Sequence, residues 1–292
     1  CPQSMDATRG NNGYMDLDLY RKIIDEAREF VLEINLFFRG EPLLHPRIVE
    51  MVRIARGAGI AVHINTNATL LRGKMIDGLL DAGLDKLTIS FDGGEKELYE
   101  QMRRGARYEK TLENTLSFLR AKAARGSSRP YTAIQVINFF DPKAPGPTVP
   151  PQFVRLFDGL PLDEFDPIWA HGWAGTMKES KDFQAAPYGH NYFPCNWLWK
   201  SLAICWDGRV ATCCGDFGPM EVFGDLNTDS LREIWNGPHM VRIRKLQREG
   251  RLGDLPLCRN CDAPWQPDGA RWRLFSASSR LIGLTYKDRQ KS

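Results

Sequence analysis

The chain has 292 residues, of which 42% are hydrophobic and 26% are charged, and these values are ordinary for a globular protein. Its length allows one large domain and a smaller one. A net charge of +3 is too small to indicate nucleic-acid binding, and no apolar run is long enough to span a bilayer. We see no signal peptide, so the seven cysteines favour metal ligation in a reducing cytoplasm over disulfide bonds.

Helix and strand patterns alternate from residue 16 to about residue 140, and a weaker helix–strand unit follows a Pro/Gly-rich loop over 141–151. Asp16 can cap a first helix, whose apolar face would contain Leu19, Ile23, Ala27 and Phe30. Five strands are predicted at 34–38, 61–65, 86–91, 133–139 and 165–170. Helices are predicted between them around 48–55, 75–80, 108–124 and 152–157. This alternation predicts βαβ units and a parallel sheet.

The sequence changes in character after about residue 185, where cysteine and Trp become frequent. The pair Asp207-Gly208 predicts a β-hairpin between residues 202–205 and 209–212, and helices are expected at 231–235 and 240–249. We therefore expect three parts. These are an α/β domain over 1–185, a small cysteine-rich α+β domain over 186–270, and a basic C-terminal tail over 271–292.

The cysteines lie at the two ends of the chain, with Cys1 first and the other six after residue 194. Cys258 and Cys261 are separated by two residues, a spacing that lets two thiolates reach one metal centre. Thiolates in fours select zinc or an iron–sulfur cluster. A structural zinc site is the alternative to a cluster, although the paired C-x2-C motifs usual for zinc are lacking.

Glycine and polar residues follow three consecutive predicted strands. They are Gly40-Glu41-Pro42, Asn65-Thr66-Asn67, and the pair Ser90 and Asp92. Ligands of parallel α/β sheets bind at the carboxyl ends of the strands. Each segment alone is compatible with a polar turn, but three at the same edge of one sheet predict a ligand site. Ser90 and Asp92 share a face of an extended strand, an arrangement that suits a ribose diol.

These segments, together with Leu43–Pro46 and the run from Asn65 to Leu71, resemble the radical S-adenosylmethionine (radical SAM) superfamily. Cys1-Pro2 resembles the last cysteine of that family's C-x3-C-x2-C loop. The family's first strand and first two cluster cysteines would lie upstream of residue 1, so we expect an N-terminally truncated chain. Arg39 stands where the family has the first Gly of Gly-Gly-Glu-Pro. The resemblance implies a partial (β/α)6 TIM-like barrel that lacks its first strand.

The later cysteines and the segment 223–236 resemble the SPASM/Twitch extension of radical SAM enzymes. The resemblance implies one auxiliary [4Fe–4S] cluster, ligated by Cys195, Cys213, Cys258 and Cys261. Adjacent residues of a strand point to opposite faces, so only one of Cys213 and Cys214 ligates easily, and the spacing from Gly208 favours Cys213. The remaining Cys205 and Cys214 are either buried hydrophobic residues or hydrogen-atom donors to a substrate radical.

The resemblance also assigns residues to the first cluster and to SAM. Cys1 would be a ligand of a [4Fe–4S] cluster whose fourth iron binds SAM. Cofactor-binding roles fall on Gly40, Glu41, Pro42, Asn67, Ser90, Asp92 and Arg103. Gly40 and Glu41 would face the methionyl ammonium, Ser90 and Asp92 the ribose or carboxylate, and Arg103 the carboxylate. For Arg103, a surface position on a helix is the alternative.

The resemblance implies that one electron cleaves SAM to methionine and a 5′-deoxyadenosyl radical, which abstracts a substrate hydrogen. We expect oxidation or epimerisation of a small polar substrate, such as a sugar or aminocyclitol, with a flavodoxin- or ferredoxin-type electron donor. Modification of a ribosomally made peptide is the alternative, and a non-catalytic cluster- or zinc-binding protein is the alternative of another class. We expect neither a nucleic-acid nor a membrane partner. A chain that begins at Cys1 is expected to be inactive without the upstream cysteines.

Overall fold

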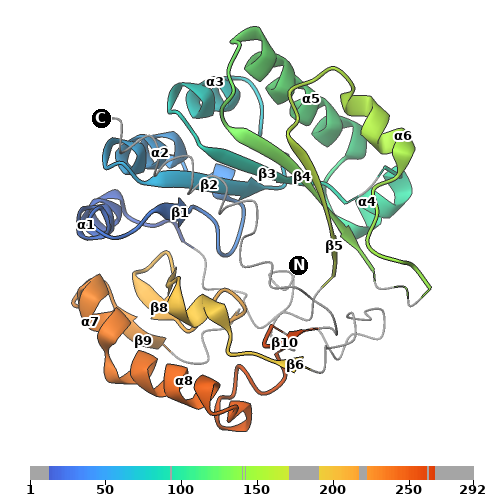
Figure 1. Cartoon of the computed structure of the whole chain (residues 1–292). Helices are drawn as coiled ribbons and strands as arrows, with labels where there is room; N and C mark the ends of the chain where they lie inside the picture. Colours follow the sequence, from blue (N-terminus) through green and yellow to red (C-terminus); the bar gives the residue numbers. More distant parts are fainter. Residues whose placement is uncertain are drawn as a thin grey trace. The chain divides into compact units, whose positions relative to one another are not determined.

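Figure 1 shows the computed structural model of the chain, which describes residues 13–92, 94–139, 141, 143–170, 191–216, 222–261 and 263–266. These residues form two compact units. One contains residues 30–170, and the other contains residues 13–29 and 191–266. The expected boundary near residue 186 and the expected tail over 271–292 lie outside the described residues.

A parallel five-stranded sheet forms the centre of the first unit. Its strands are β1 (Glu33–Asn35), β2 (Ala61–Thr66), β3 (Lys86–Ser90), β4 (Tyr131–Asn138) and β5 (Glu164–Trp169). The spatial order of the strands is the same as their order in the chain, and every neighbouring pair is parallel. Successive βαβ units, each adding a strand beside the previous one, produce this order. The predicted α/β class with a separate small domain is confirmed.

Helices cover one side of this sheet, as Figure 1 shows for α2, α3 and α5. The helical segments of this unit are η3 (Pro42–Leu44), α2 (Ile48–Gly57), α3 (Lys74–Asp81), α4 (Lys96–Met102), α5 (Tyr108–Ala124), α6 (Pro151–Val154) and η4 (Arg155–Phe157). The sequence analysis did not predict α4. The predicted first strand is shorter than expected, because the chain leaves the sheet after Asn35 and turns towards Gly40.

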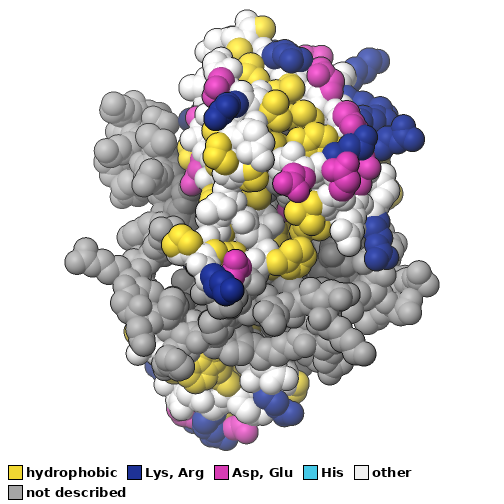
Figure 2. Space-filling view, turned by 90° about the vertical axis from the view of Figure 1, so that its right-hand side faces the viewer, with side chains coloured by type: hydrophobic (Ala, Val, Ile, Leu, Met, Phe, Trp, Pro, Cys, Tyr) yellow, Lys and Arg dark blue, Asp and Glu magenta, His cyan; other side chains and the backbone are white. Residues whose placement is uncertain are grey.

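Alternating residues of the strands pack beneath the helices. Val62, Ile64, Leu87, Ile89 and Ile134 are all fully buried. These residues are β-branched or leucine, and they occupy every second position, as a strand with one apolar face requires. The surface of this unit mixes side-chain types, and on the face displayed in Figure 2 hydrophobic side chains lie among Lys, Arg, Asp and Glu.

The second unit contains short antiparallel strands and two longer helices. Its elements are α1 (Leu17–Ala27), β6 (Asn191–Tyr192), η5 (Asn196–Trp199), β7 (Ala203–Ile204), β8 (Arg209–Ala211), β9 (Val222–Asp225), α7 (Leu231–Asn236), α8 (Pro238–Arg248), η6 (Leu252–Asp254) and β10 (Trp265–Gln266). The predicted hairpin is confirmed as β7 and β8, which pair antiparallel. Gly208 has a φ of +90° in the turn, a conformation that glycine adopts readily.

Helix α1 packs within the second unit. The Lys22 ammonium donates to the Leu226 carbonyl at 2.6 Å, and the Glu26 carboxylate accepts from the Leu231 N–H at 2.7 Å. The Asp16 N-cap is confirmed, since its carboxylate accepts from two N–H groups of the first turn. The predicted apolar face was wrong at Phe30, which follows the helix and is 47% exposed. The buried face instead includes Leu17, Tyr20, Ile23, Ile24 and Ala27.

Within the ranges given above, the helices are too short or too polar to cross a bilayer.

A buried lysine of α5 forms hydrogen bonds with β4 and with the segment before β5. The Lys122 side chain is 1% exposed, and its ammonium donates to Asp163 Oδ2 at 2.7 Å, to the Pro161 carbonyl at 3.0 Å and to Thr132 Oγ1 at 3.3 Å. Asp163 also accepts from the Thr132 N–H at 2.7 Å. The ammonium therefore has a complete set of three acceptors, which offsets the cost of burying its charge.

Replacing Lys122 by Met should lower the free energy of unfolding by about 2 to 3 kcal/mol, because it leaves a partly buried carboxylate without its cation. Lys110→Met, on an exposed position of the same helix, is the matched control and should cost less than about 0.5 kcal/mol. Urea denaturation of both variants measures the difference. Equal losses in the two variants would contradict the structural role of Lys122.

Candidate functional site

Glu41 joins the ends of the first two strands. Its Oε1 accepts from the Thr66 hydroxyl at 2.6 Å and the Leu43 N–H at 3.1 Å, and its Oε2 accepts from the Asn67 N–H at 2.8 Å. Burial raises the pKa of this carboxyl, while these hydrogen bonds and the charge of Arg103 oppose the shift. A carboxylate offers about four lone-pair sites, so Oε2 can accept one further donor.

The residues on either side of Glu41 determine the shape of this turn. Gly40 has a φ of +76°, in the left-handed region that favours glycine. Pro42 is the first residue of η3, where its fixed φ suits a helix start. Both residues therefore lie where the sequence predicted a turn at the carboxyl edge of the sheet, and both position the Glu41 carboxylate.

Asp92 and Arg103 form a buried ion pair at the same edge. Arg103 Nε donates to Asp92 Oδ2 at 2.5 Å, and the two side chains are 23% and 3% exposed. Asp92 Oδ1 lies 3.4 Å from the Ile137 N–H. Because Arg103 also lowers the pKa of Glu41, its guanidinium lies within electrostatic range of both carboxylates. The structure thus places Arg103, which follows α4, near Glu41 and Asp92 at the predicted strand ends, and the contact of all three with a cofactor stays a prediction.

Ser90 and Asn67 hydrogen-bond within the protein. The Ser90 hydroxyl donates to Asn65 Oδ1 at 2.8 Å, across neighbouring strands. Asn67 Oδ1 accepts from the Thr69 hydroxyl at 2.7 Å and the Thr69 N–H at 3.0 Å, which closes a local turn. Both residues lie at the predicted edge, and their contact with a ligand stays a prediction.

The sheet face opposite the buried apolar one is polar. Its residues on the five strands include Glu33, Asn35, His63, Asn65, Lys86, Thr88, Ser90, Tyr131, Gln135, Glu164 and Asp166. We call this set the polar sheet face. Cross-strand hydrogen bonds run from the Tyr131 hydroxyl to Glu164 Oε2 and from Gln135 Nε2 to Asp166 Oδ2, both at 3.0 Å. The sequence analysis did not identify this face, although the alternation Glu164-Phe165-Asp166 indicates it.

His63 occupies the middle of the polar sheet face. Its Nδ1 lies 3.0 Å from Asn35 Oδ1, and its Nε2 lies 2.8 Å from Thr88 Oγ1. Burial, and then the charge of Lys86, lowers its pKa to about 3. The imidazole is therefore neutral at physiological pH, and a ring with its proton on Nδ1 satisfies both neighbours.

Because the pKa of His63 falls from 6.5 unfolded to about 3 folded, this residue contributes stability above pH 6.5 that is lost as the pH falls. Between pH 7.5 and 5.5, the free energy of unfolding should drop by up to about 1.4 kcal/mol through His63 alone. His63→Gln should reduce that drop, as measured by urea denaturation at both pH values. Parallel pH dependences of wild type and variant would refute a buried neutral imidazole.

Four thiols of the second unit lie close enough to influence one another. They belong to Cys195, Cys213, Cys214 and Cys258. Desolvation raises the pKa of the first three, and negative charge on neighbouring thiols raises it further for Cys195 and Cys213. No disulfide joins any of the six described cysteines. In the ranges that the structure describes, no three Cys, His, Asp or Glu side chains surround a metal-binding point, so the thiols are gathered without closing on one centre.

The other predicted cysteine positions differ in their surroundings. The Cys261 N–H donates to the Cys258 carbonyl at 3.1 Å, so the C-x2-C segment forms a tight turn. Cys205 is buried at the end of β7, where its N–H donates to the Arg209 carbonyl at 2.8 Å. Cys214 is exposed. Cys1 lies outside the described residues. The choice between Cys213 and Cys214 as ligand stays a prediction.

The surroundings of the thiols fit the expected cluster. Three of the four predicted ligands are near one another, because Cys213 lies within electrostatic range of Cys195 and Cys258, and burial raises the pKa of Cys195 and Cys213. Soft thiolates in such a region are the chemistry that an iron–sulfur cluster requires. The buried polar atoms of this unit that have no hydrogen-bond partner among the described residues include Gln247 Nε2 and Thr212 Oγ1. Gln247 contacts the backbone of Cys195, and Thr212 precedes Cys213 in the chain. Cluster and thiolate sulfurs accept hydrogen bonds from such groups.

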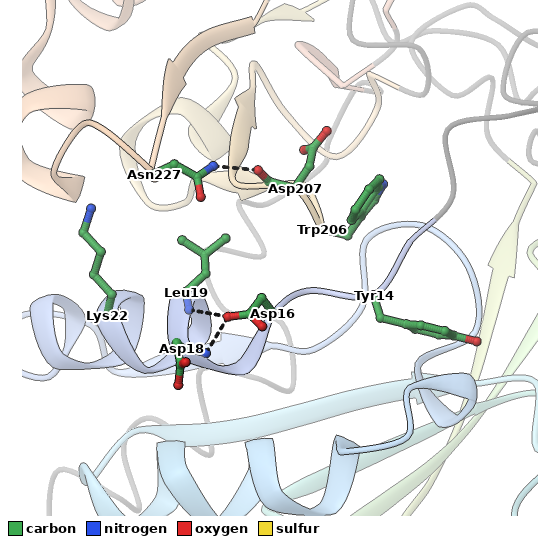
Figure 3. Close-up of a pocket in the computed structure, with 8 residues that line it drawn as sticks. All are labelled: Tyr14, Asp16, Asp18, Leu19, Lys22, Trp206, Asp207 and Asn227. Atoms are coloured by element: carbon green, nitrogen blue, oxygen red, sulfur yellow. Dashed lines mark hydrogen bonds between the residues drawn. The ribbon is translucent and has the colours of Figure 1, made fainter.

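A surface cavity of about 570 Å³ also lies within the second unit (Figure 3). It is lined by Tyr14, Asp16, Asp18, Leu19, Lys22, Trp206, Asp207 and Asn227. Asp16 caps α1, Asp207 is paired with Arg209 at 2.7 Å, and Lys22 donates to a backbone carbonyl at 2.6 Å. Since these charged groups already have partners in the protein, we assign the cavity no chemistry.

Comparison with known proteins identifies two domains. Residues 1–125 match the model of the Radical SAM superfamily, and residues 195–262 match that of SPASM, an iron–sulfur cluster-binding domain. Both resemblances expected from the sequence are confirmed. The domains imply S-adenosylmethionine and [4Fe–4S] clusters, an auxiliary cluster among them, which confirms the expected cofactors.

One relative matches along nearly the whole chain. Over 273 residues, the chain is 24% identical to the S-adenosyl-L-methionine-dependent 2-deoxy-scyllo-inosamine dehydrogenase of Niallia circulans, covering 90% of this chain and 86% of that protein. Over 82 residues it is 42% identical to the tungsten-containing aldehyde ferredoxin oxidoreductase cofactor-modifying protein of Pyrococcus furiosus, which is 27% of this chain. The matched segment spans only 23% of the length of the Pyrococcus protein.

Solved structures share the fold. The crystal structure of BtrN in complex with AdoMet and 2-DOIA has a TM-score of 0.57 and 20% identity, over 90% of this chain and 85% of that one. Streptococcus suis SuiB bound to the precursor peptide SuiA has a TM-score of 0.64 and 14% identity, over 88% of this chain and 66% of that one. At these identities the likeness shows the fold and no more.

Proposed function

Because this chain belongs to the radical SAM superfamily and carries a SPASM iron–sulfur domain, we propose that it oxidises a small polar substrate, such as an aminocyclitol or sugar, after abstracting a hydrogen atom. The observation that carries the proposal is the match along 90% of the chain to an aminocyclitol dehydrogenase. The polar sheet face supports it independently, because its paired carboxylate, amide and phenol groups suit hydroxyl and amino groups of a substrate.

When bound, a [4Fe–4S] cluster and S-adenosylmethionine supply the hydrogen-abstracting adenosyl radical of this family. We propose that Cys1 is a ligand of that cluster. The free lone pair of Glu41 Oε2 accepts a hydrogen bond from the methionyl ammonium, and Gly40 and Pro42 hold the turn that presents it. Ser90 and Asn67 provide further contacts at the same edge.

The Asp92–Arg103 pair has a positioning role in this proposal. Asp92 fixes the guanidinium through Nε, which leaves the outer N–H groups of Arg103 for a carboxylate of the bound cofactor. The Arg103 side chain is 23% exposed, so these N–H groups can be reached from solvent. Asp92 itself is nearly buried, so it acts on the cofactor mainly through Arg103.

In the second domain, we propose that Cys195, Cys213, Cys258 and Cys261 hold the auxiliary [4Fe–4S] cluster. Four cysteine ligands leave no open iron, so this cluster transfers electrons and does not bind substrate. A flavodoxin- or ferredoxin-type donor supplies reducing equivalents. Such clusters require a reducing compartment, and we propose the cytoplasm.

Peptide modification and epimerisation are the two alternative reactions, and each is favoured by a specific observation. Modification of a peptide is favoured by the fold match to SuiB and by 32% identity over 103 residues to the PqqA peptide cyclase of Rhodopseudomonas palustris. Epimerisation would need a hydrogen donor. Cys214 is exposed and Cys205 is buried, so Cys214 is the better candidate for that role.

The function is tested with the full-length protein, reconstituted anaerobically with iron and sulfide and supplied with S-adenosylmethionine and a reductant. With 2-deoxy-scyllo-inosamine as probe, we expect formation of 5′-deoxyadenosine above background and a product two hydrogens lighter, both measured by mass spectrometry. Asp166→Asn should lower the rate by about 10-fold, since it removes a charged acceptor from the polar sheet face. Glu97→Gln, on an exposed position of α4, is the control.

Three other experimental results would change the proposed function. Turnover with short ribosomal precursor peptides alone would favour the peptide-modifying function. A product of unchanged mass but inverted stereochemistry would favour epimerisation. Zinc without acid-labile sulfide in the purified protein would overturn the redox function altogether.

The auxiliary ligand set is tested by two cysteines that are similarly buried. Cys258 is 9% exposed and Cys205 is 5% exposed. Cys258→Ser should lose the iron and sulfide of one cluster, because a thiolate ligand is removed. Cys205→Ser should retain them. Iron and sulfide analysis after reconstitution measures both, and equal losses in the two variants would contradict the proposed ligands.

A further inference from the structure

Gln247 is a fully buried amide beside the gathered thiols. It lies in the last turn of α8 and is 0% exposed. Its Oε1 accepts from the Cys195 N–H at 3.1 Å and lies 3.2 Å from the Tyr192 hydroxyl oxygen. The Tyr192 hydroxyl donates its one proton to the Gln247 backbone carbonyl. The side chain is therefore tied to the residue that begins the predicted ligand set.

The Cys195 N–H fixes the orientation of the amide. Turning the side chain over would place its NH2 group against this N–H and leave the N–H without its acceptor. In the orientation that satisfies Cys195, the nitrogen Nε2 is buried and has no acceptor among the described residues. A buried N–H without an acceptor is unfavourable, and such groups in native proteins usually mark a missing partner.

The surroundings indicate what that partner is. Negative charge at Cys258 and Cys195 adds to burial in raising the pKa of Tyr192, so its hydroxyl lies within electrostatic range of both thiols. The same hydroxyl is bonded to Gln247. Cys258 packs with Leu246, the neighbour of Gln247 in α8. The nearby chemistry is therefore rich in sulfur, and sulfur is a hydrogen-bond acceptor when it ligates iron.

We propose that Gln247 is a positioning residue of the auxiliary cluster, in which Oε1 holds the backbone of Cys195 and Nε2 donates a hydrogen bond to a sulfur of the cluster or of a ligating thiolate. This inference rests on the proposed function. A hydrogen bond to sulfur stabilises the reduced, more negative state of a cluster, so Gln247 raises its reduction potential.

The test measures the reduction potential of the auxiliary cluster by EPR-monitored titration. A Cys1→Ala background removes the proposed ligand of the other cluster and simplifies the spectrum. Gln247→Leu should shift the potential to a more negative value with cluster content unchanged. Gln247→Glu, which keeps an acceptor for the Cys195 N–H but has no donor at neutral pH, should shift it in the same direction. Gln101→Leu, on an exposed position of α4, should leave it unchanged.

An unchanged potential in Gln247→Leu at full cluster content would overturn the inference, and it would indicate that a water molecule accepts the Nε2 hydrogen bond instead. If both Gln247 variants lose the cluster, pulsed EPR of the wild-type protein with ¹⁵N-labelled glutamine side chains reads the contact directly. A ¹⁵N coupling supports the inference, and its absence overturns it. Failure of the wild-type protein to form an auxiliary cluster would overturn the proposed function itself.

Discussion

The parallel sheet of the first unit depends on one constraint, which is that each strand must place apolar residues beneath the helices on alternate positions. Val62 and Ile64 of β2 and Leu87 and Ile89 of β3 meet this requirement and are fully buried. The pairing register then fixes which residues lie on the opposite face of the sheet, because a shift by one residue would exchange the two faces. The polar sheet face and the polar strand ends are therefore consequences of how the core is packed.

The carboxyl edge of this sheet contains two carboxylates, Glu41 and Asp92, whose oxygens accept from donors of neighbouring segments. Asp92 forms an ion pair with the Arg103 guanidinium. Glu41 accepts hydrogen bonds from three donors and lies within electrostatic range of Arg103. Burial raises the pKa of the Glu41 carboxyl, and the donors around it oppose that shift. The donors come from different elements, so the edge holds its geometry only when the strands, η3 and α4 are all in place. This arrangement preorganises the edge without using the last acceptor site of Glu41.

The sequence was sufficient to predict features that depend on residues close together in the chain. The predicted helix over 108–124 agrees with α5, and the hairpin at Gly208 follows from a turn that needs a positive φ. Helix α4 was missed because it has seven residues and is mostly polar, so no apolar period marks it. The polar sheet face was missed for a different reason. Which residues share a row across strands depends on register, and register is a property of long-range packing.

At the thiol site, too, the sequence shows the spacing of the cysteines but not which of them the fold brings together. Spacing identified candidate ligands in three segments, but only folding brings Cys195, Cys213 and Cys258 within range of each other's charge. Tyr192 and Gln247 carry no motif, and their relevance appears only through contacts across more than fifty residues of chain. The two candidate sites also differ in kind. At the sheet edge, carboxylates are already balanced by donors of the protein. At the thiols, the charge of Lys200 opposes desolvation at Cys195 and Cys214 without cancelling it, and their pKa values stay raised. Metal binding there would replace the thiol protons and add stability that the edge has without it.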